Sequence, residues 1–195
     1  MLYSGAANYL RALSHEHLYS HNIRIFGMGE SGVEDRLREL MNSLENPTLA
    51  PYAKPGEVLL RVTARAGSEA EAETLMAPVI ARIRDAVGEY IYGIDVPGLE
   101  YAALELLKSR GLTLATAESC TGGLIAKRIT DIPGSSGVFA GGVVSYTNAV
   151  KAAALGVPQA LLDEFGAVSE PVARAMAEGA RRVMKTDLAV STTGV

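Results

Sequence analysis

The sequence is poor in cysteine and in long apolar runs, and each shortage excludes a class of protein. One cysteine among 195 residues excludes a disulfide framework within the chain, and a single thiol is typical of a reducing compartment. No run of 18 apolar residues occurs, which excludes an ordinary membrane-spanning helix. Residues 1–13 lack the basic start and apolar core of a secretory signal. We therefore expect a cytoplasmic protein that makes no contact with a membrane.

Histidine is also scarce, and all three histidines lie near the amino terminus: His15, His17 and His21. His17 and His21 are four residues apart and could face the same side of a helix as metal ligands. No carboxylate or cysteine stands at ligand spacing beside them, so a solvated segment is the simpler interpretation. We expect no metal and no other cofactor.

Basic residues do not outnumber acidic ones, which argues against a general attraction to nucleic acid. The formal net charge is −4 and the sequence pI is 5.4. The stretch Gly29-Glu-Ser-Gly32 has the spacing with which KH domains clamp a nucleic-acid backbone, but it follows a strand-like run. Glu30 within it would also repel phosphate. We favour a turn ahead of a helix, and we expect no nucleic-acid partner.

Hydrophobic periodicity divides the chain into two α/β units. Residues 1–22 resemble a short helical or irregular lead-in, 23–93 form a small unit, 94–98 form a linker, and 99–195 form a second unit. In the small unit the expected order is β-α-β-α-β, which is too antiparallel in appearance for a nucleotide-binding fold. Its strands are expected at 23–26, 58–65 and 90–92, with apolar stripes of helical spacing at 33–44 and 75–87.

The second unit alternates helices with near-continuous apolar strands, a pattern that predicts a mostly parallel sheet covered on both faces. The chain stops at Val195 directly after the third strand, so we expect a three-layer α/β/α domain that is incomplete at its carboxyl end. Strands are expected at 112–117, 141–146 and 188–192, and helices at 99–109, at 124–132, near Asn148, after Pro158 and after Ser169.

Hydroxyl and glycine residues gather at the carboxyl ends of these three strands, where open α/β sheets bind ligands. The first strand runs into a turn before a helix, which can expose a nucleophile and aim helix N–H groups at an anion. A tight turn with a serine cap is the alternative. The residues concerned are Glu118, Ser119, Cys120, Thr121, Gly122 and Gly123 after the first strand, Ser145, Tyr146, Thr147, Asn148 and Lys151 after the second, and Ser191, Thr192, Thr193 and Gly194 after the third.

Lys151 is the candidate base for Ser119, because residues 99–195 contain no histidine. If Asn148 caps the next helix, Lys151 falls in the first turn, where the helix dipole lowers the pKa of a lysine. A partly neutral lysine can accept the proton of a serine. The alternatives are a solvated surface lysine and, for Tyr146, a buried strand aromatic.

Two residues of the first turn have competing interpretations. Cys120 is a rival nucleophile, although a lone cysteine between a strand and a helix is more often a small buried apolar residue. Glu118 either orients the turn or contacts the substrate, and a capping role is the other interpretation.

Several stretches of the sequence closely resemble the CinA family, in the order and spacing of that family and over nearly the whole chain. In the second unit they are Ala117–Gly123, Val144–Asn148 with Lys151, Gly166–Pro171 and Ser191–Gly194, and in the small unit Phe26–Ser31, Asn46–Ala50 and Pro55–Val58. The resemblance implies a KH-like or ferredoxin-like middle domain followed by an amidohydrolase domain.

In this family the carboxyl-terminal domain is a nicotinamide mononucleotide deamidase of pyridine nucleotide salvage, which releases nicotinic acid mononucleotide and ammonia. The resemblance implies that Ser119, Tyr146 and Lys151 are the catalytic group, with Lys151 and Tyr146 moving the proton of Ser119. Substrate contacts are expected from the strand-end residues Glu118, Cys120, Thr121, Gly122, Gly123, Asn148, Thr192 and Gly194.

The sequence also departs from the family. Full-length members begin with a large domain that resembles molybdopterin-binding proteins and is associated with ADP-ribose pyrophosphatase activity, which we expect to be absent here. The family continues past Gly194 with further strands and substrate contacts. The alternative function is therefore a non-catalytic nucleotide-binding or docking module. In either case we expect a small nucleotide as ligand and self-association as a homo-oligomer.

Overall fold

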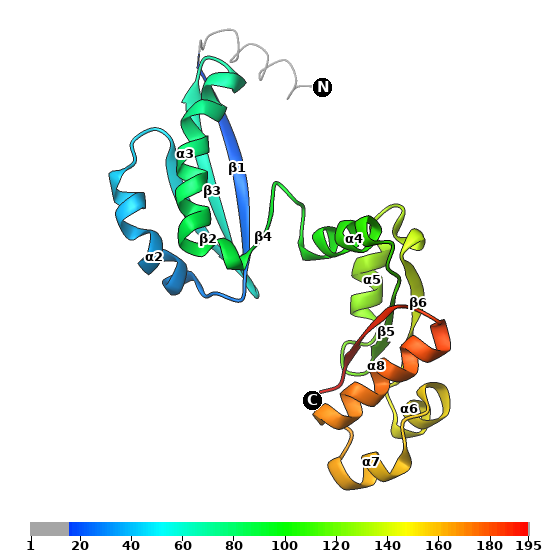
Figure 1. Cartoon of the computed structure of the whole chain (residues 1–195). Coiled ribbons are helices and arrows are strands. Elements are labelled where there is room, and N and C mark those ends of the chain that lie inside the picture. Colours follow the sequence, from blue (N-terminus) through cyan, green and yellow to red (C-terminus); the bar gives the residue numbers. More distant parts are fainter. Residues whose placement is uncertain (1–15, 195) are drawn as a thin grey trace, which may run out of the picture. The chain divides into compact units, whose positions relative to one another are not determined.

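The protein folds as two separate α/β units in the computed structural model, which describes residues 16–194 (Figure 1). The first unit comprises Met1–Leu99 and the second Glu100–Val195. Each unit has its own sheet and its own apolar core. We describe each unit by itself.

The first unit is a four-stranded antiparallel sheet with strand order β2-β3-β1-β4. Both of its helices contribute to one apolar core with the sheet, so that one face of the sheet is covered. The elements are β1 (His17–Phe26), α2 (Glu30–Ser43), β2 (Thr48–Lys54), β3 (Glu57–Ala66), α3 (Glu69–Val87), a 3-10 turn (Gly88–Tyr90) and β4 (Ile91–Ile94).

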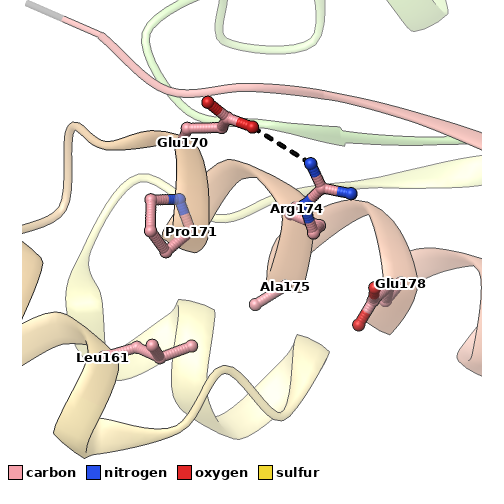
Figure 2. Close-up of a pocket in the computed structure, with 6 residues that line it drawn as sticks. All are labelled: Leu161, Glu170, Pro171, Arg174, Ala175 and Glu178. Carbon is pink, nitrogen blue, oxygen red and sulfur yellow. Dashed lines mark hydrogen bonds and ion pairs between the residues drawn. The ribbon is translucent and has the colours of Figure 1, made fainter.

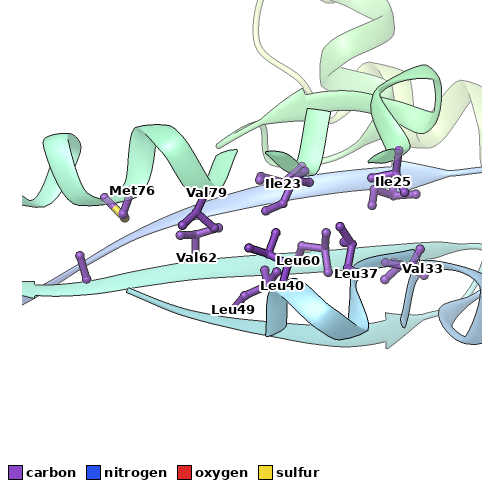
Figure 3. Close-up of a cluster of buried hydrophobic side chains, with 14 of the residues drawn as sticks. Ile23, Ile25, Val33, Leu37, Leu40, Leu49, Leu60, Val62, Met76 and Val79 are labelled. Carbon is purple, nitrogen blue, oxygen red and sulfur yellow. The ribbon is translucent and has the colours of Figure 1, made fainter. Parts of the chain in front are cut away.

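Alternation along the strands builds this core, since every second residue points toward the helices. Figure 3 shows these strand residues facing the apolar stripes of the two helices. The labelled side chains are Ile23 and Ile25 from β1, Leu49 from β2, Leu60 and Val62 from β3, Val33, Leu37 and Leu40 from α2, and Met76 and Val79 from α3.

Two predictions for the first unit are wrong. Strand β1 begins at His17, so 17–22 extend the sheet, whereas a helical or irregular lead-in was expected; residues 1–15 of that lead-in lie outside the described part. Strand β2 was not predicted at all. It contains Pro51, which cannot donate to a ladder, but β2 lies at the edge of the sheet, where a missing N–H is tolerated.

The second unit has a three-stranded parallel sheet with strand order β6-β5-β7, as the apolar runs predicted. The central strand β5 is buried along its whole length. The elements are α4 (Leu99–Arg110), β5 (Leu114–Glu118), α5 (Leu124–Thr130), a 3-10 turn (Ser135–Gly137), β6 (Phe139–Val144), α6 (Asn148–Leu155), α7 (Gln159–Phe165), α8 (Glu170–Met184) and β7 (Leu188–Thr192).

Helices cover both faces of this sheet, which gives the expected α/β/α layers. Ala115 and Ala117 pack against apolar residues of α6, α7 and α8, whereas Leu114 packs against residues of α4 and α5. The parallel register pairs Glu118 with both Val144 and Thr192, so the three strands end at the same level. The three predicted strand ends therefore meet at one edge.

Candidate active site

Ser119 and Lys151 are brought together at this edge. The Lys151 Nζ lies 3.0 Å from the Ser119 Oγ. The lysine side chain is 1% exposed and Ser119 is 6% exposed, so the solvated-lysine interpretation is wrong. Lys151 is the fourth residue of α6, whose N-cap is Thr147; the Thr147 hydroxyl accepts from the Val150 N–H. The prediction that Asn148 caps this helix is therefore wrong as well.

Two main-chain carbonyl groups complete the surroundings of the Lys151 amine. Its Nζ lies 2.9 Å from the carbonyl oxygen of Ser145 and 3.5 Å from that of Tyr146. No carboxylate of the described residues pairs with it. Burial lowers the pKa of Lys151, and the nearby Cys120 thiol, when ionised, opposes this shift. The predicted direction is confirmed, but its main cause is burial.

This arrangement orients an uncharged Lys151 toward Ser119. An uncharged amine has two N–H groups and one lone pair, whereas a carbonyl oxygen can only accept a hydrogen bond. The carbonyls of Ser145 and Tyr146 therefore take the two N–H groups. The lone pair is left facing the Ser119 hydroxyl, which is the geometry of a base beside a nucleophile.

Glu118 has the capping role. Its carboxylate accepts the backbone N–H groups of Gly123, Ile125 and Ala126 at 2.8–3.1 Å and the Thr121 hydroxyl at 2.8 Å. Burial acts to raise the pKa of Glu118, but these donors outweigh it and the pKa is lowered. Glu118 is thus an ionised cap at the start of α5.

The turn after Ser119 retains two backbone N–H groups that have no partner within residues 16–194, those of Cys120 and Thr121. Such N–H groups beside a nucleophile can stabilise a developing oxyanion. Gly122 and Gly123 have φ values of 59° and 99°, which disfavour any residue with a Cβ. The two glycines are therefore what allows the chain to turn here.

The other predicted residues lie around this turn. Thr192 and Thr121 share a hydrogen bond of 2.7 Å between their hydroxyls, which ties β7 to the turn. A Cβ at Gly194 would lie 3.1 Å from the Cys120 Sγ, so Gly194 lies beside the turn that follows Ser119. Cys120 is exposed and its thiol is free, contrary to the buried interpretation. Asn148 is exposed at the start of α6.

Tyr146 is not brought into the hydrogen-bonded group. Strand β6 ends at Val144, and the Tyr146 side chain is 74% exposed, so the buried-aromatic interpretation is wrong. Within the described chain its hydroxyl makes no hydrogen bond. Only its main-chain carbonyl contacts Lys151. A proton-transfer role for this hydroxyl stays a prediction.

The sequence places Ser145 at the second strand end but assigns it no role. Its carbonyl accepts from Lys151, and its N–H donates to the Glu118 carbonyl at 2.7 Å. Its hydroxyl is fully buried and has no hydrogen-bond partner among the described residues. A main-chain acceptor leaves no trace in residue type, so the only available signal was the position of Ser145 at the end of a predicted strand.

The histidine prediction also needs correction. His21 is partly exposed but paired: its Nδ1 lies 2.5 Å from the Asp95 carboxylate and its Nε2 lies 2.7 Å from that of Glu73. Both carboxylates come from elements distant in sequence, so spacing could not reveal them. Among residues 16–194 no group of three His, Cys, Asp or Glu side chains could hold a metal ion. The prediction for His15 lies outside the described residues.

A groove of about 470 Å³ lies between α7 and α8, apart from the residues discussed so far (Figure 2). An ion pair between Glu170 and Arg174 crosses its rim at 3.0 Å. None of the predicted site residues lines this groove. The lining residues are Leu161, Glu170, Pro171, Arg174, Ala175 and Glu178.

Comparisons with known proteins match both units. The CinA C-terminal domain family matches residues 98–195, and the KH domain of damage-inducible protein CinA matches residues 20–93. The chain is 48% identical to a CinA-like protein of Kosmotoga olearia and 46% identical to one of Dictyoglomus turgidum, each over 187 residues. These alignments cover 96% of this chain but 45% and 46% of the relatives, so the chain spans slightly less than half of their length.

Among solved structures, the competence/damage inducible protein CihA from Agrobacterium tumefaciens is 44% identical, with a TM-score of 0.47. That match covers 51% of this chain and 62% of the other. A CinA superfamily protein from Escherichia coli is 36% identical, with a TM-score of 0.49 and coverage of 49% and 56%.

Proposed function

The chain belongs to the CinA family, and from this premise we propose that its second unit hydrolyses the carboxamide of nicotinamide mononucleotide to nicotinic acid mononucleotide and ammonia. The observation that best supports the proposal is the 3.0 Å contact between the Ser119 hydroxyl and the buried Lys151 amine. The choice of substrate rests on the resemblance of the strand-end motifs to those of the family's deamidase domain.

In the proposed first step, the uncharged Lys151 amine accepts the proton of Ser119 while the Ser119 Oγ attacks the carboxamide carbon. The two unpaired N–H groups of Cys120 and Thr121 stabilise the resulting oxyanion. The Lys151 ammonium then returns its proton to the departing nitrogen, and ammonia leaves. An ester between Ser119 and the nicotinoyl group remains.

In the second step water releases the acid. Lys151, uncharged again, takes a proton from the water, which attacks the ester carbon, and then returns that proton to Ser119. A base of this kind contributes roughly 10²- to 10⁴-fold to the rate. Because burial is the main cause of the lowered pKa of Lys151, the dry surroundings of the amine support its use as a base.

We place this reaction in the cytoplasm, because the exposed free thiol of Cys120 persists best in a reducing compartment. Within the described residues no helix is long and apolar enough to cross a bilayer. Self-association, the absence of nucleic-acid binding and the incompleteness of the second domain remain predictions.

Ammonia release from nicotinamide mononucleotide by the 195-residue chain tests the proposal. We expect release by the unaltered protein and its loss by at least about 10³-fold in Ser119→Ala and Lys151→Met. Cys120→Ala is the matched control, since it removes the rival nucleophile from the same turn and should leave release within a few-fold.

Loss of release in Cys120→Ala but not in Ser119→Ala would instead identify the cysteine as the nucleophile. Calorimetry with the same nucleotide distinguishes the remaining alternative. Binding without ammonia release by the unaltered chain would favour a non-catalytic nucleotide-binding module and contradict the proposed hydrolysis.

A further inference from the structure

Tyr146 directly follows the buried Ser145, but within residues 16–194 its own side chain has no hydrogen-bond partner. It is 74% exposed, and its hydroxyl makes no hydrogen bond within residues 16–194. Its main chain nevertheless helps to build the site, because its carbonyl lies 3.5 Å from the Lys151 Nζ. An aromatic ring that has no partner of its own, on a residue that helps to build the site, is available to a substrate.

Tyr146 is close enough to meet a substrate that reacts with Ser119. The Lys151 Nζ joins the two residues, with 3.5 Å to the Tyr146 carbonyl and 3.0 Å to the Ser119 hydroxyl. A tyrosine ring extends several ångströms from its own backbone, roughly the span of two such contacts. The Tyr146 ring thus belongs to a residue at the same edge of the sheet as Ser119, where a carboxamide under attack by Ser119 must lie.

The surface next to Tyr146 is apolar. Exposure alternates along the chain, with Val144 at 51%, Ser145 at 0% and Tyr146 at 74%, so the side chains of Val144 and Tyr146 both face solvent. A Cβ at Gly123 would lie 3.3 Å from a Val144 methyl group, and the next residue, Leu124, is also exposed. Exposed apolar side chains beside a nucleophile suit a flat ring better than a phosphate or a ribose.

The hydrogen bonds of Lys151 argue against proton transfer by the Tyr146 hydroxyl. The amine has three neighbours, the Ser119 hydroxyl and the carbonyls of Ser145 and Tyr146, and these use all of its donor and acceptor positions. A tyrosine hydroxyl would have to displace one of them. The face of the ring, in contrast, is free.

We propose that Tyr146 binds the ring of the substrate face to face and thereby selects a positively charged pyridinium over an uncharged dihydropyridine. This inference rests on the proposed function, which supplies a substrate whose ring carries that charge. A cation over an aromatic face is attracted by the ring quadrupole, and this attraction corresponds to roughly a 2- to 30-fold difference in affinity.

Calorimetry on Ser119→Ala protein tests the proposal, because this variant cannot turn over the ligand. The two probes are nicotinamide mononucleotide and its reduced form, which has the same carboxamide, ribose and phosphate but an uncharged ring. We expect the oxidised form to bind more tightly by roughly 2- to 30-fold. Adding Tyr146→Phe should keep most of that preference, and adding Tyr146→Leu should abolish it.

The matched control is Tyr52→Leu, the same exchange at a half-exposed tyrosine of the first unit, which should leave the preference unchanged. Equal affinities for the two probes, a preference that survives Tyr146→Leu, or a loss in Tyr146→Phe as large as in Tyr146→Leu would each overturn the inference. The last of these would assign the role to the hydroxyl. Binding of neither probe would overturn the proposed function together with it.

Discussion

The two units of this protein bury different kinds of side chain. The core of the first unit is apolar, and its charged groups lie at or near the surface. Burying a polar or charged group costs free energy unless it is paired, so such groups persist where something other than stability retains them. Within residues 16–194 the buried polar residues all belong to the second unit: Thr116, Glu118, Ser119, Ser135, Ser145, Lys151 and Thr186.

The two buried charges of the second unit also differ from each other. Glu118 is bonded by four donors and so behaves as a structural anchor for α5. Within residues 16–194 Lys151 faces only neutral oxygen atoms and has no counter-ion within hydrogen-bond distance. A buried amine without a counter-ion is a poor structural element, and because burial favours its uncharged form it is a good base, which is why we assign that role to Lys151.

Replacing Lys151 should separate function from stability most clearly. In Lys151→Met we expect ammonia release to fall by at least about 10³-fold. We expect the free energy of unfolding to change by no more than about 1 kcal/mol, because the lost hydrogen bonds are offset by the removal of a buried amine. Denaturant titration beside the activity assay measures both. A variant that loses activity only because it unfolds would contradict this view of Lys151.

Replacing Glu118 should have the opposite profile, with a large loss of stability. Glu118→Ala leaves the N–H groups of Gly123, Ile125 and Ala126 without an acceptor, and we expect the second unit to lose about 2 to 4 kcal/mol. Glu105→Ala, at an exposed carboxylate paired with Lys108, is the control and should cost at most about 0.5 kcal/mol. Equal losses of stability in the two variants would contradict the role of Glu118 as a structural anchor for α5.

The first unit should show a pH dependence of its own, centred on His21. Hydrogen bonds to Asp95 raise the pKa of His21, burial opposes this, and Glu73 raises it further. The protonated form is thus stabilised in the folded state. This stability is fully present below the ordinary pKa of 6.5 and is lost as the pH rises through the raised value.

We expect a decrease of about 1 kcal/mol in the stability of the first unit over that rise, measured by denaturant titration at several pH values. His21→Gln should remove the dependence. His17→Gln, at a histidine that only packs edge-on against Tyr19, should keep it. A dependence that persists in His21→Gln would contradict the assignment.

The smallest expected effect concerns Thr116, whose buried hydroxyl has no hydrogen-bond partner in the part of the chain that the structure describes. Thr116→Val replaces that hydroxyl with a methyl group of similar size, so we expect the second unit to gain up to about 1 kcal/mol. Thr186→Val is the control, because the Thr186 hydroxyl donates to the Leu188 carbonyl at 2.9 Å and its removal should destabilise. Destabilisation by Thr116→Val would show that its hydroxyl is paired.

Sequence reasoning predicted the parallel sheet because its strands are apolar along their length and are separated by helical stripes. It predicted the pairing of Ser119 with Lys151 because parallel strands end at one edge and no histidine was available. It missed strand β2 because Pro51 argues against a strand unless the edge position is known. The boundaries of the units stay predictions.

Other features could not be predicted because they depend on contacts between residues that are distant in the sequence or on the exact ends of helices and strands. The N-cap of α6 is Thr147, whereas Asn148 was predicted, and residue type alone does not distinguish the two positions. The partners of His21 come from α3 and from the segment after β4. Tyr146 is exposed because β6 ends at Val144, whereas the predicted strand continued to residue 146.

The pH profile of kcat/KM for ammonia release from nicotinamide mononucleotide tests the central claim most directly, namely that buried Lys151 is the base for Ser119. We expect a rise with pH to a plateau, because Lys151 must lose its proton, with a midpoint below the ordinary lysine pKa of 10.5. Cys120→Ala should move that midpoint to lower pH, since the thiolate favours the charged amine. A flat profile between about pH 6 and 10, or the same profile in Lys151→Met, would contradict the claim.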